Sequence, residues 1–153
     1  MRYVIDKKNE YIQLKGEKYP EYRKINIGEF FKISSVPTSC DACIKINNFI
    51  ALELVEGKPY PMQPNHVVTR VSAKFYLGRR KYQTLFSYLP NGAVFKVKST
   101  SGSKVNDVVY LKYAGDNVYD LSNKRDNGLF PNKDTVVFYY YDAHVLVDYG
   151  IDD

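Results

Sequence analysis

Two cysteines stand three residues apart in the chain, at Cys40 and Cys43. Thiolates at this spacing supply half of a tetrahedral zinc site, which needs two further cysteine or histidine ligands. The two histidines, His66 and His144, are distant in sequence from the pair and from each other. A redox-active pair would require a strand–helix–strand unit, and no such pattern surrounds these residues. We therefore expect reduced thiols, no disulfide, no cofactor and no metal; zinc held with both histidines is the minor alternative.

Nucleophilic catalysis needs a serine or cysteine beside a base, and neither histidine stands in a setting that favours this role. His144 lies between Ala143 and Val145 in an apolar segment, and His66 follows a proline-rich segment. The nine glycines are scattered singly, so the chain has no glycine-rich phosphate loop. We expect a protein without enzymatic activity. An enzyme that uses Cys40 or His144 is the least favoured alternative.

Basic residues are segregated along the chain. Nine lysines and arginines and no acidic residue lie between Glu56 and Asp107, within a chain of net charge +5. Tyrosines and phenylalanines are interleaved with these cations. Cations neutralise the phosphates of nucleic acids, and exposed rings stack on unpaired bases at roughly 1–3 kcal/mol each. The sequence predicts one continuous positive contact face made by Arg70, Lys74, Tyr76, Arg79, Arg80, Lys81, Tyr82, Lys96 and Lys98.

The same stretch has a second interpretation that requires no partner. Its phenylalanines, at 75, 86 and 95, would form the core, and its cations would be solvated or paired with acidic residues. The acids available for such pairs are Asp120, Asp126 and Asp134. The sequence leaves both interpretations open.

The elements that position these residues are expected to be strands, because the 153 residues include 15 Tyr and 8 Phe and frequent turn signals. The pattern predicts a first hairpin from 2–5 and 11–14, and an extended proline-containing loop at 57–64. It predicts further strands at 44–55, 67–77, 82–89, 93–98, 108–113, 118–121, 135–141 and 145–149. A polar loop is expected at 99–103 and another at 122–128. The chain shows no long amphipathic helix and no internal repeat.

We therefore expect a mainly β fold, a single small barrel or sandwich of short antiparallel strands, with an α+β fold as the alternative. One domain would span residues 1–153. Within it, an N-terminal element (1–56) would precede a basic β core (57–106) and an acidic C-terminal β segment (107–153).

Three short runs follow one another in the second half of the chain. They are Leu89-Pro90-Asn91-Gly92-Ala93-Val94-Phe95, then Val109-Tyr110-Leu111-Lys112, then Val118-Tyr119-Asp120-Leu121. This order of a leucine–proline–x–glycine–x–x–phenylalanine turn, a valine–tyrosine–x–lysine strand and an aspartate–leucine return resembles small SH3-like β-barrel proteins of phages and mobile elements. The resemblance covers residues 89–121. It implies an SH3-like half-barrel and no particular activity.

The expected function is binding of nucleic acid or a nucleoprotein through the basic aromatic β surface, by a protein encoded by a phage or mobile element. The alternative is a phage-type inhibitor, anti-defence or anti-CRISPR-like, that docks on a host protein complex and blocks its nucleic-acid path. In that case the Tyr-rich residues 138–141 would supply protein contacts. Without an apolar run long enough to span a membrane or a signal-peptide core, we expect a cytoplasmic location, in the host cell if phage-encoded. The oligomeric state is left open, a homodimer included.

Overall fold

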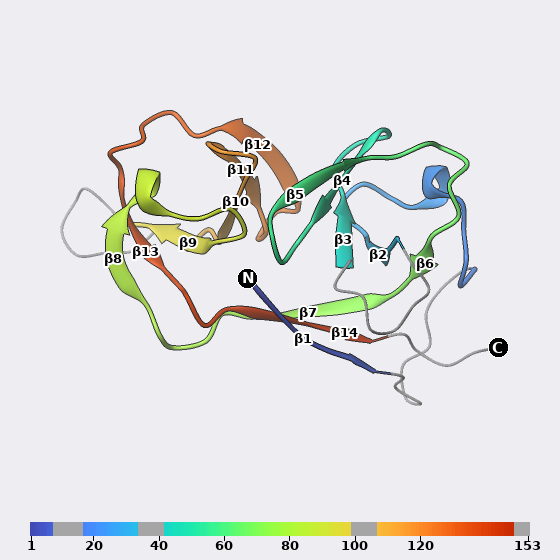
Figure 1. Ribbon diagram of the computed structural model, residues 1–153, viewed down its shortest axis with the longest axis horizontal. Coiled ribbons are helices and arrows are strands. Elements are labelled where there is room, and N and C mark those ends of the chain that lie inside the picture. Colours follow the sequence, from blue (N-terminus) through green and yellow to red (C-terminus); the bar gives the residue numbers. More distant parts are fainter. Residues whose placement is uncertain (8–16, 34–41, 99–106, 149–153) are drawn as a thin grey trace.

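The computed structural model describes residues 1–7, 17–33, 42–98 and 107–148, and these ranges form short strands and two single-turn 3₁₀ helices. The prediction of a mainly β fold is confirmed, with the strands arranged in three open sheets. Figure 1 shows the two larger sheets side by side, with the smallest sheet running below both of them. No helix in the described ranges is long or apolar enough to cross a membrane.

The three sheets draw on different parts of the chain. In spatial order, the five-stranded sheet contains β5 (Lys58–Pro61), β4 (Ile50–Glu53), β3 (Ala42–Lys45), β2 (Phe30–Lys32) and β6 (Thr69–Arg70). The six-stranded sheet contains β12 (Arg125–Leu129), β11 (Asn117–Asp120), β10 (Tyr110–Tyr113), β9 (Val94–Val97), β13 (Val136–Tyr139) and β8 (Tyr82–Leu85). The smallest sheet contains β1 (Arg2–Lys7), β14 (His144–Asp148) and β7 (Ser72–Tyr76).

Several predicted boundaries are wrong for local reasons. The expected long strand at 44–55 is a hairpin, because Asn47 Oδ1 accepts the backbone N–H groups of Phe49 and Ile50, each at 2.8 Å, and so closes a turn. The expected loop at 57–64 contains β5, which tolerates its prolines because it lies at a sheet edge. The predicted strand 82–89 ends at Leu85 and turns into a helix, and the expected loop at 122–128 contains most of β12.

The two ends of the chain pair with each other. Residues 2–5 belong to β1, which runs parallel to β14. The partner strand expected at 11–14 lies outside the described residues, as does the loop expected at 99–103. We call the smallest sheet, made of β1, β14 and β7, the central sheet. It includes a parallel pair, whereas the expectation was of antiparallel strands.

The two larger sheets are repeats of one folding unit, so the expectation of no internal repeat is wrong. Each unit begins with a single helical turn, η1 (Tyr22–Lys24) or η2 (Phe86–Tyr88), followed by four strands in a meander. The fifth strand of each unit pairs with the first strand of its meander. Thus β6 pairs with β2 in one unit, and β13 pairs with β9 in the other. We call the parts containing β2–β6 and β9–β13, each with its helix, the first and second repeats.

Matching backbone hydrogen bonds establish the equivalence position by position. The N–H of Tyr22 donates to His66 O at 2.7 Å, and the N–H of Phe86 donates to Thr135 O at 2.9 Å. The N–H of Gly28 donates to Lys45 O at 2.8 Å, and the N–H of Gly92 to Lys112 O at 2.7 Å. Equivalent pairs are Tyr22 and Phe86, Ile25 and Leu89, Gly28 and Gly92, Phe31 and Phe95, Lys45 and Lys112, Glu53 and Asp120, and Gly57 and Lys124.

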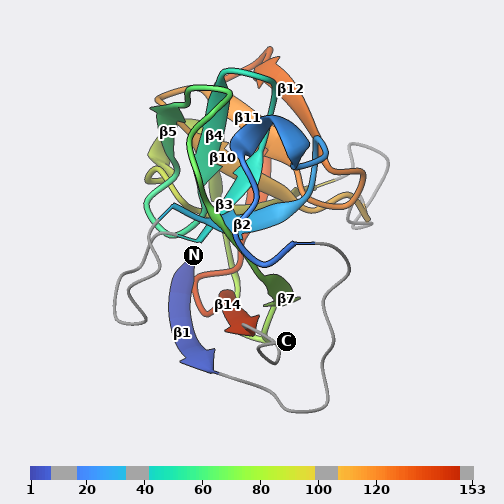
Figure 2. The same ribbon diagram turned by 90° about the vertical axis from the view of Figure 1, so that its right-hand side faces the viewer.

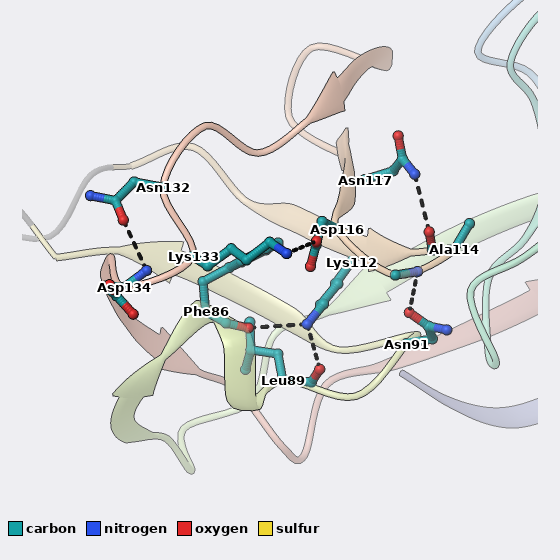
Figure 3. A network of polar contacts seen from close by, with 11 residues as sticks. Phe86, Leu89, Asn91, Lys112, Ala114, Asp116, Asn117, Asn132, Lys133 and Asp134 are labelled. Carbon is teal, nitrogen blue, oxygen red and sulfur yellow. Dashed lines mark hydrogen bonds and ion pairs between the residues drawn. The ribbon is translucent and has the colours of Figure 1, made fainter.

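A buried lysine organises each repeat. In the second, Lys112 Nζ donates to the carbonyls of Phe86 and Leu89 at 3.1 and 2.8 Å and lies 4.6 Å from the centroid of the Phe86 ring (Figure 3). In the first, Lys45 makes the same contacts with Tyr22 and Ile25, at 3.1, 2.8 and 4.6 Å. Burial lowers the pKa of both lysines. Each ammonium ties a sheet strand to the helical turn that covers it.

The repeats are joined through the central sheet. The chain passes from β6 into β7 and from β13 into β14, and β7 and β14 pair antiparallel with Phe75 opposite Val145. One apolar cluster includes Leu52 of the first repeat, Leu111 of the second and Val145 of the central sheet. Figure 2 shows β7 and β14 lying against the end of the larger sheets. The two repeats therefore share a core as well as a sheet.

We expect replacement of Lys112 by Met to lower the free energy of unfolding by about 2–4 kcal/mol, because two buried carbonyls lose their shared donor while the apolar stem is kept. Lys45→Met should behave alike. The control is Lys133→Met, at an exposed lysine in a surface ion pair with Asp116, which should change stability by less than about 1 kcal/mol. Denaturant unfolding measures all three, and equal stabilities for Lys112→Met and the control would contradict the assigned role.

A glycine pair tests the contact between the repeats. Gly92 and Gly115 both have φ of 86°, but a Cβ on Gly92 would lie 2.3 Å from Val55 O, whereas one on Gly115 meets nothing within 4 Å. Both Ala variants carry the strain of a left-handed backbone, about 1–2 kcal/mol, and only Gly92→Ala adds a backbone clash of roughly 1–3 kcal/mol. Thermal unfolding should rank Gly92→Ala clearly below Gly115→Ala. The reverse order would show that the repeats do not touch here.

Candidate nucleic-acid interface

Three lysines of the predicted contact set gather on one face of the six-stranded sheet. The register places Lys96 on β9 opposite Phe138 on β13, and Phe138 opposite Gln83 on β8. Residues directly opposite in adjacent strands share a face, so these side chains form a row across three strands. Lys98 follows at the end of β9, where its Nζ donates to Gln83 Oε1 at 2.9 Å.

Aromatic rings hold the lysine ends in place. Lys81 Nζ lies 5.0 Å from the centroid of Phe138 and 5.5 Å from that of Tyr140, and Lys96 Nζ lies 5.8 Å from the same Tyr140 ring. A cation over a ring face is attracted by about 0.5–1 kcal/mol at exposed sites. We call Lys81, Lys96 and Lys98 the lysine row.

Three tyrosines cluster at the edge of the same sheet. The ring centroids of Tyr82 and Tyr139 are 5.4 Å apart, those of Tyr82 and Tyr141 5.6 Å, and those of Tyr139 and Tyr141 6.4 Å. Tyr82 is 52% exposed and Tyr141 46%. Burial, and secondarily the neighbouring Tyr82, raises the pKa of Tyr139 above its ordinary value. We call these three residues the tyrosine cluster.

The lysine row and the tyrosine cluster lie on opposite faces of the sheet and meet at its edge. Tyr82 is opposite Tyr139, whereas the next residue, Gln83, is opposite Phe138 beside the lysines. Successive strand residues alternate between faces, which separates the two groups. Among the described residues, β8 is the outermost strand of this sheet, so both groups lie at the same edge. The result is a strip that includes both faces of the sheet at β8.

Residues 78–81, which we call the basic turn, come directly before β8. Arg79 and Arg80 are exposed in the connection between β7 and β8, next to Lys81. Gly78 enters the turn with φ of 77°, and a Cβ there would lie 3.5 Å from Asp142 Cβ. Neither Arg79, Arg80 nor a member of the lysine row forms an ion pair with another residue in the described part of the chain. Their positive charges remain available to an external anion.

Arg70, Lys74 and Tyr76 lie outside this strip, so the structure does not bring the whole predicted set together in it. Arg70 lies on β6 in the first repeat, where its Nη1 pairs with Glu29 Oε2 at 2.9 Å. Lys74 and Tyr76 are exposed on β7 in the central sheet, where the Tyr76 ring stacks on His144 at 5.0 Å. The strand pattern could not reveal this, because β6 and β7 belong to different sheets although they are adjacent in sequence.

Sequence reasoning also left residues out of the nucleic-acid set. Tyr139 and Tyr141 complete the tyrosine cluster, and Phe138 and Tyr140 support the lysines. The run of four aromatic residues at 138–141 was a signal, and it was assigned only to protein contacts. What the sequence could not give is the pairing of β13 with β8 and β9, which brings this run beside the basic stretch.

The acidic residues that could have neutralised the basic stretch have other neighbours. Asp120 lies 3.9 Å from Arg125, and its carboxylate accepts the N–H of Asn123. Tyr113 donates its hydroxyl to Asp126 at 2.5 Å. The alternative in which these acids pair with the lysine row is therefore not what the described residues show. Phe86 and Phe95 are buried in the core, as the same alternative expected.

The residues considered for catalysis lie apart. Cys43 is a fully buried thiol in the core of the first repeat, and Cys40 lies outside the described residues. His66 is exposed, and His144 is half-buried with Nδ1 3.1 Å from Asp142 O. Within the described ranges, no three His, Cys, Asp or Glu side chains gather in a way that could hold a metal ion.

No family model, curated protein or solved structure matches this chain.

Proposed function

We propose that this is a non-enzymatic binding protein that holds a strand of nucleic acid along the β8 edge of the six-stranded sheet. The observation that carries the proposal is the convergence, on one sheet edge, of exposed tyrosines with cations that have no acidic partner among the described residues. An edge strand has side chains on both faces of its sheet, so a flexible polymer that follows it can contact both groups at once. A folded duplex would reach only one of them.

The chemistry divides between the two faces. Phosphates would contact the lysine row together with Arg79 and Arg80, and each neutralised phosphate releases counterions. Unpaired bases would stack on Tyr82 and Tyr141, whose rings are half exposed. Neither contact reads base edges, so binding is expected to depend on salt and on strandedness more than on sequence.

A second candidate is supported by Tyr88, which is 74% exposed on η2 outside both groups. Exposed tyrosines are frequent hot spots of protein interfaces. In this alternative the protein is an inhibitor that docks on a nucleic-acid-binding complex of a host cell and occupies its nucleic-acid path. The resemblance of residues 89–121 to SH3-like proteins of phages and mobile elements, and the cytoplasmic location, stay predictions that accompany either candidate.

The basic turn provides the first test. Replacing Arg79, Arg80 and Lys81 together with Glu should abolish binding of a labelled single-stranded oligonucleotide, and the melting temperature should be unchanged because the turn is exposed. The control carries the same charge change at exposed Lys58, Arg125 and Lys133 and should retain binding. Fluorescence anisotropy measures both. Equal affinities in the two variants would assign the effect to net charge and remove the turn from the site.

The tyrosines provide a test that does not alter charge. Tyr82→Ala with Tyr141→Ala should weaken single-strand binding by roughly 1–3 kcal/mol for each lost stack and leave the salt dependence unchanged. Tyr19→Ala, at a residue 53% exposed in the first repeat, is the matched control. If the double variant binds single strands as wild type does and Tyr88→Ala abolishes capture of a nucleic-acid-binding complex, the inhibitor candidate replaces this one.

A further inference from the structure

A groove of about 460 Å³ lies between the first repeat, the central sheet and one turn of the second repeat. Its lining includes Asn26, Glu29 and Phe30 of the first repeat, Arg70 and Ser72 at the passage from β6 to β7, and Lys124 from the turn between β11 and β12. The volume is in the range of sites that hold small molecules. None of the strands of the proposed nucleic-acid strip lines it.

The repeat explains why an opening exists at this junction of the two repeats. Where Gly57 of the first repeat meets Gly92 of the second, the backbones touch: a Cβ on Gly57 would lie 2.5 Å from Gly92 N. The equivalent meeting on the opposite side is between Lys124 and Gly28. There a Cβ on Gly28 would be 3.1 Å from the Cβ of Lys124, so a side chain now stands between the two backbones.

Lys124 occupies this position at a conformational cost. Its φ is 55°, close to the 63° of Gly57, and a left-handed backbone is unfavourable for a residue with a Cβ. Glycine, asparagine or aspartate would be the expected choice there. A strained residue that persists beside a groove is a reason to look for a role at that position.

The charges of the groove suit an anion that also carries hydrogen-bonding groups. Lys124 Nζ lies 5.3 Å from the centroid of Phe30, at the wall of the groove. Two contacts fix the guanidinium of Arg70. Its Nη1 pairs with Glu29 Oε2 at 2.9 Å, and its Nε donates to the backbone carbonyl of Glu17 at 2.9 Å. The guanidinium has further N–H donors that can bind a ligand. Glu29, Asn26 and Ser72 offer acceptors and donors to neutral polar groups.

We propose that this groove binds a small phosphate monoester of nucleotide size, with the phosphate between Lys124 and Arg70 and the sugar hydroxyls at Glu29 and Asn26. Fixed guanidinium and ammonium groups are suited to phosphate oxygens, through charge-assisted hydrogen bonds. The carboxylate of Glu29 weakens the attraction of Arg70 for an anion without other polar groups. The same carboxylate can accept hydrogen bonds, so a ligand with hydroxyl donors should bind more tightly. The site is independent of the proposed nucleic-acid strip.

The test uses the whole protein, with 5′-AMP, inorganic phosphate and adenosine as probes in isothermal titration calorimetry and in NMR of the labelled amides. AMP should bind, phosphate more weakly and adenosine not at all, and AMP should shift the amides of Ser72 and Ala73. Absence of AMP binding at concentrations up to about 10 mM would overturn the proposal, because a site with a Kd above that value has a binding free energy of only a few kcal/mol. So would shifts confined to β8 and the basic turn.

Lys124→Gly separates binding from folding. It restores the residue found at the equivalent position 57, so the melting temperature should be unchanged or raised, while AMP affinity should fall by about tenfold or more with the loss of a charged contact. Lys124→Met keeps the side chain that stands between the backbones and should lose affinity equally. Glu29→Gln should tighten phosphate binding. Wild-type AMP affinity in Lys124→Gly and Lys124→Met would contradict the assigned site.

Discussion

In each repeat a lysine ammonium lies inside the protein, held by two backbone carbonyls and the face of an aromatic ring. The charge is costly to bury, and the two carbonyls and the ring offset that cost only when the helical turn sits directly over the strand. The arrangement thus specifies one position of η1 and η2 on their sheets. The strands that follow, and the return of β6 and β13, depend on that position.

The two repeats keep this shared interior and differ at the surface. The lysine row, the tyrosine cluster and the β8 edge belong to the second repeat, where Tyr82 and Tyr139 occupy places held by Lys18 and Arg70 in the first. The repeats meet at two equivalent junctions. Gly57 closes one of them against Gly92, whereas the side chain of Lys124 stands at the other, beside Gly28. The duplication therefore supplies a scaffold with two sets of surfaces that can diverge, and the central sheet holds the sets in fixed relation.

The features of this fold that depend on neighbouring residues could be predicted from the sequence, whereas those that depend on contacts between distant residues could not. Alternation predicted the strands around Lys74, Lys96 and Tyr110, because it reflects local burial. The repeat was not predicted, because the equivalent residues change identity in most places, as with Cys43 for Tyr110 or Ala51 for Val118. What is preserved is mainly backbone hydrogen bonds, the buried lysine and a few single residues such as Phe31 and Phe95. Arg70 was misplaced because a change of sheet between β6 and β7 has no local signal. Arg79, Arg80 and Lys81 were predicted as contact residues, whereas the proximity of Lys81 to Tyr140 depends on long-range strand pairing.

We propose that the β8 edge holds single-stranded nucleic acid through both of its faces. Amide chemical shifts of the labelled protein, followed during titration with a short single-stranded oligonucleotide at low and high salt, test it most directly. The account predicts shifts at residues 78–84, 96–98 and 138–141 that weaken together as salt rises, with little change in the first repeat. Shifts centred on β2–β6, or an unchanged spectrum at low salt, would contradict it.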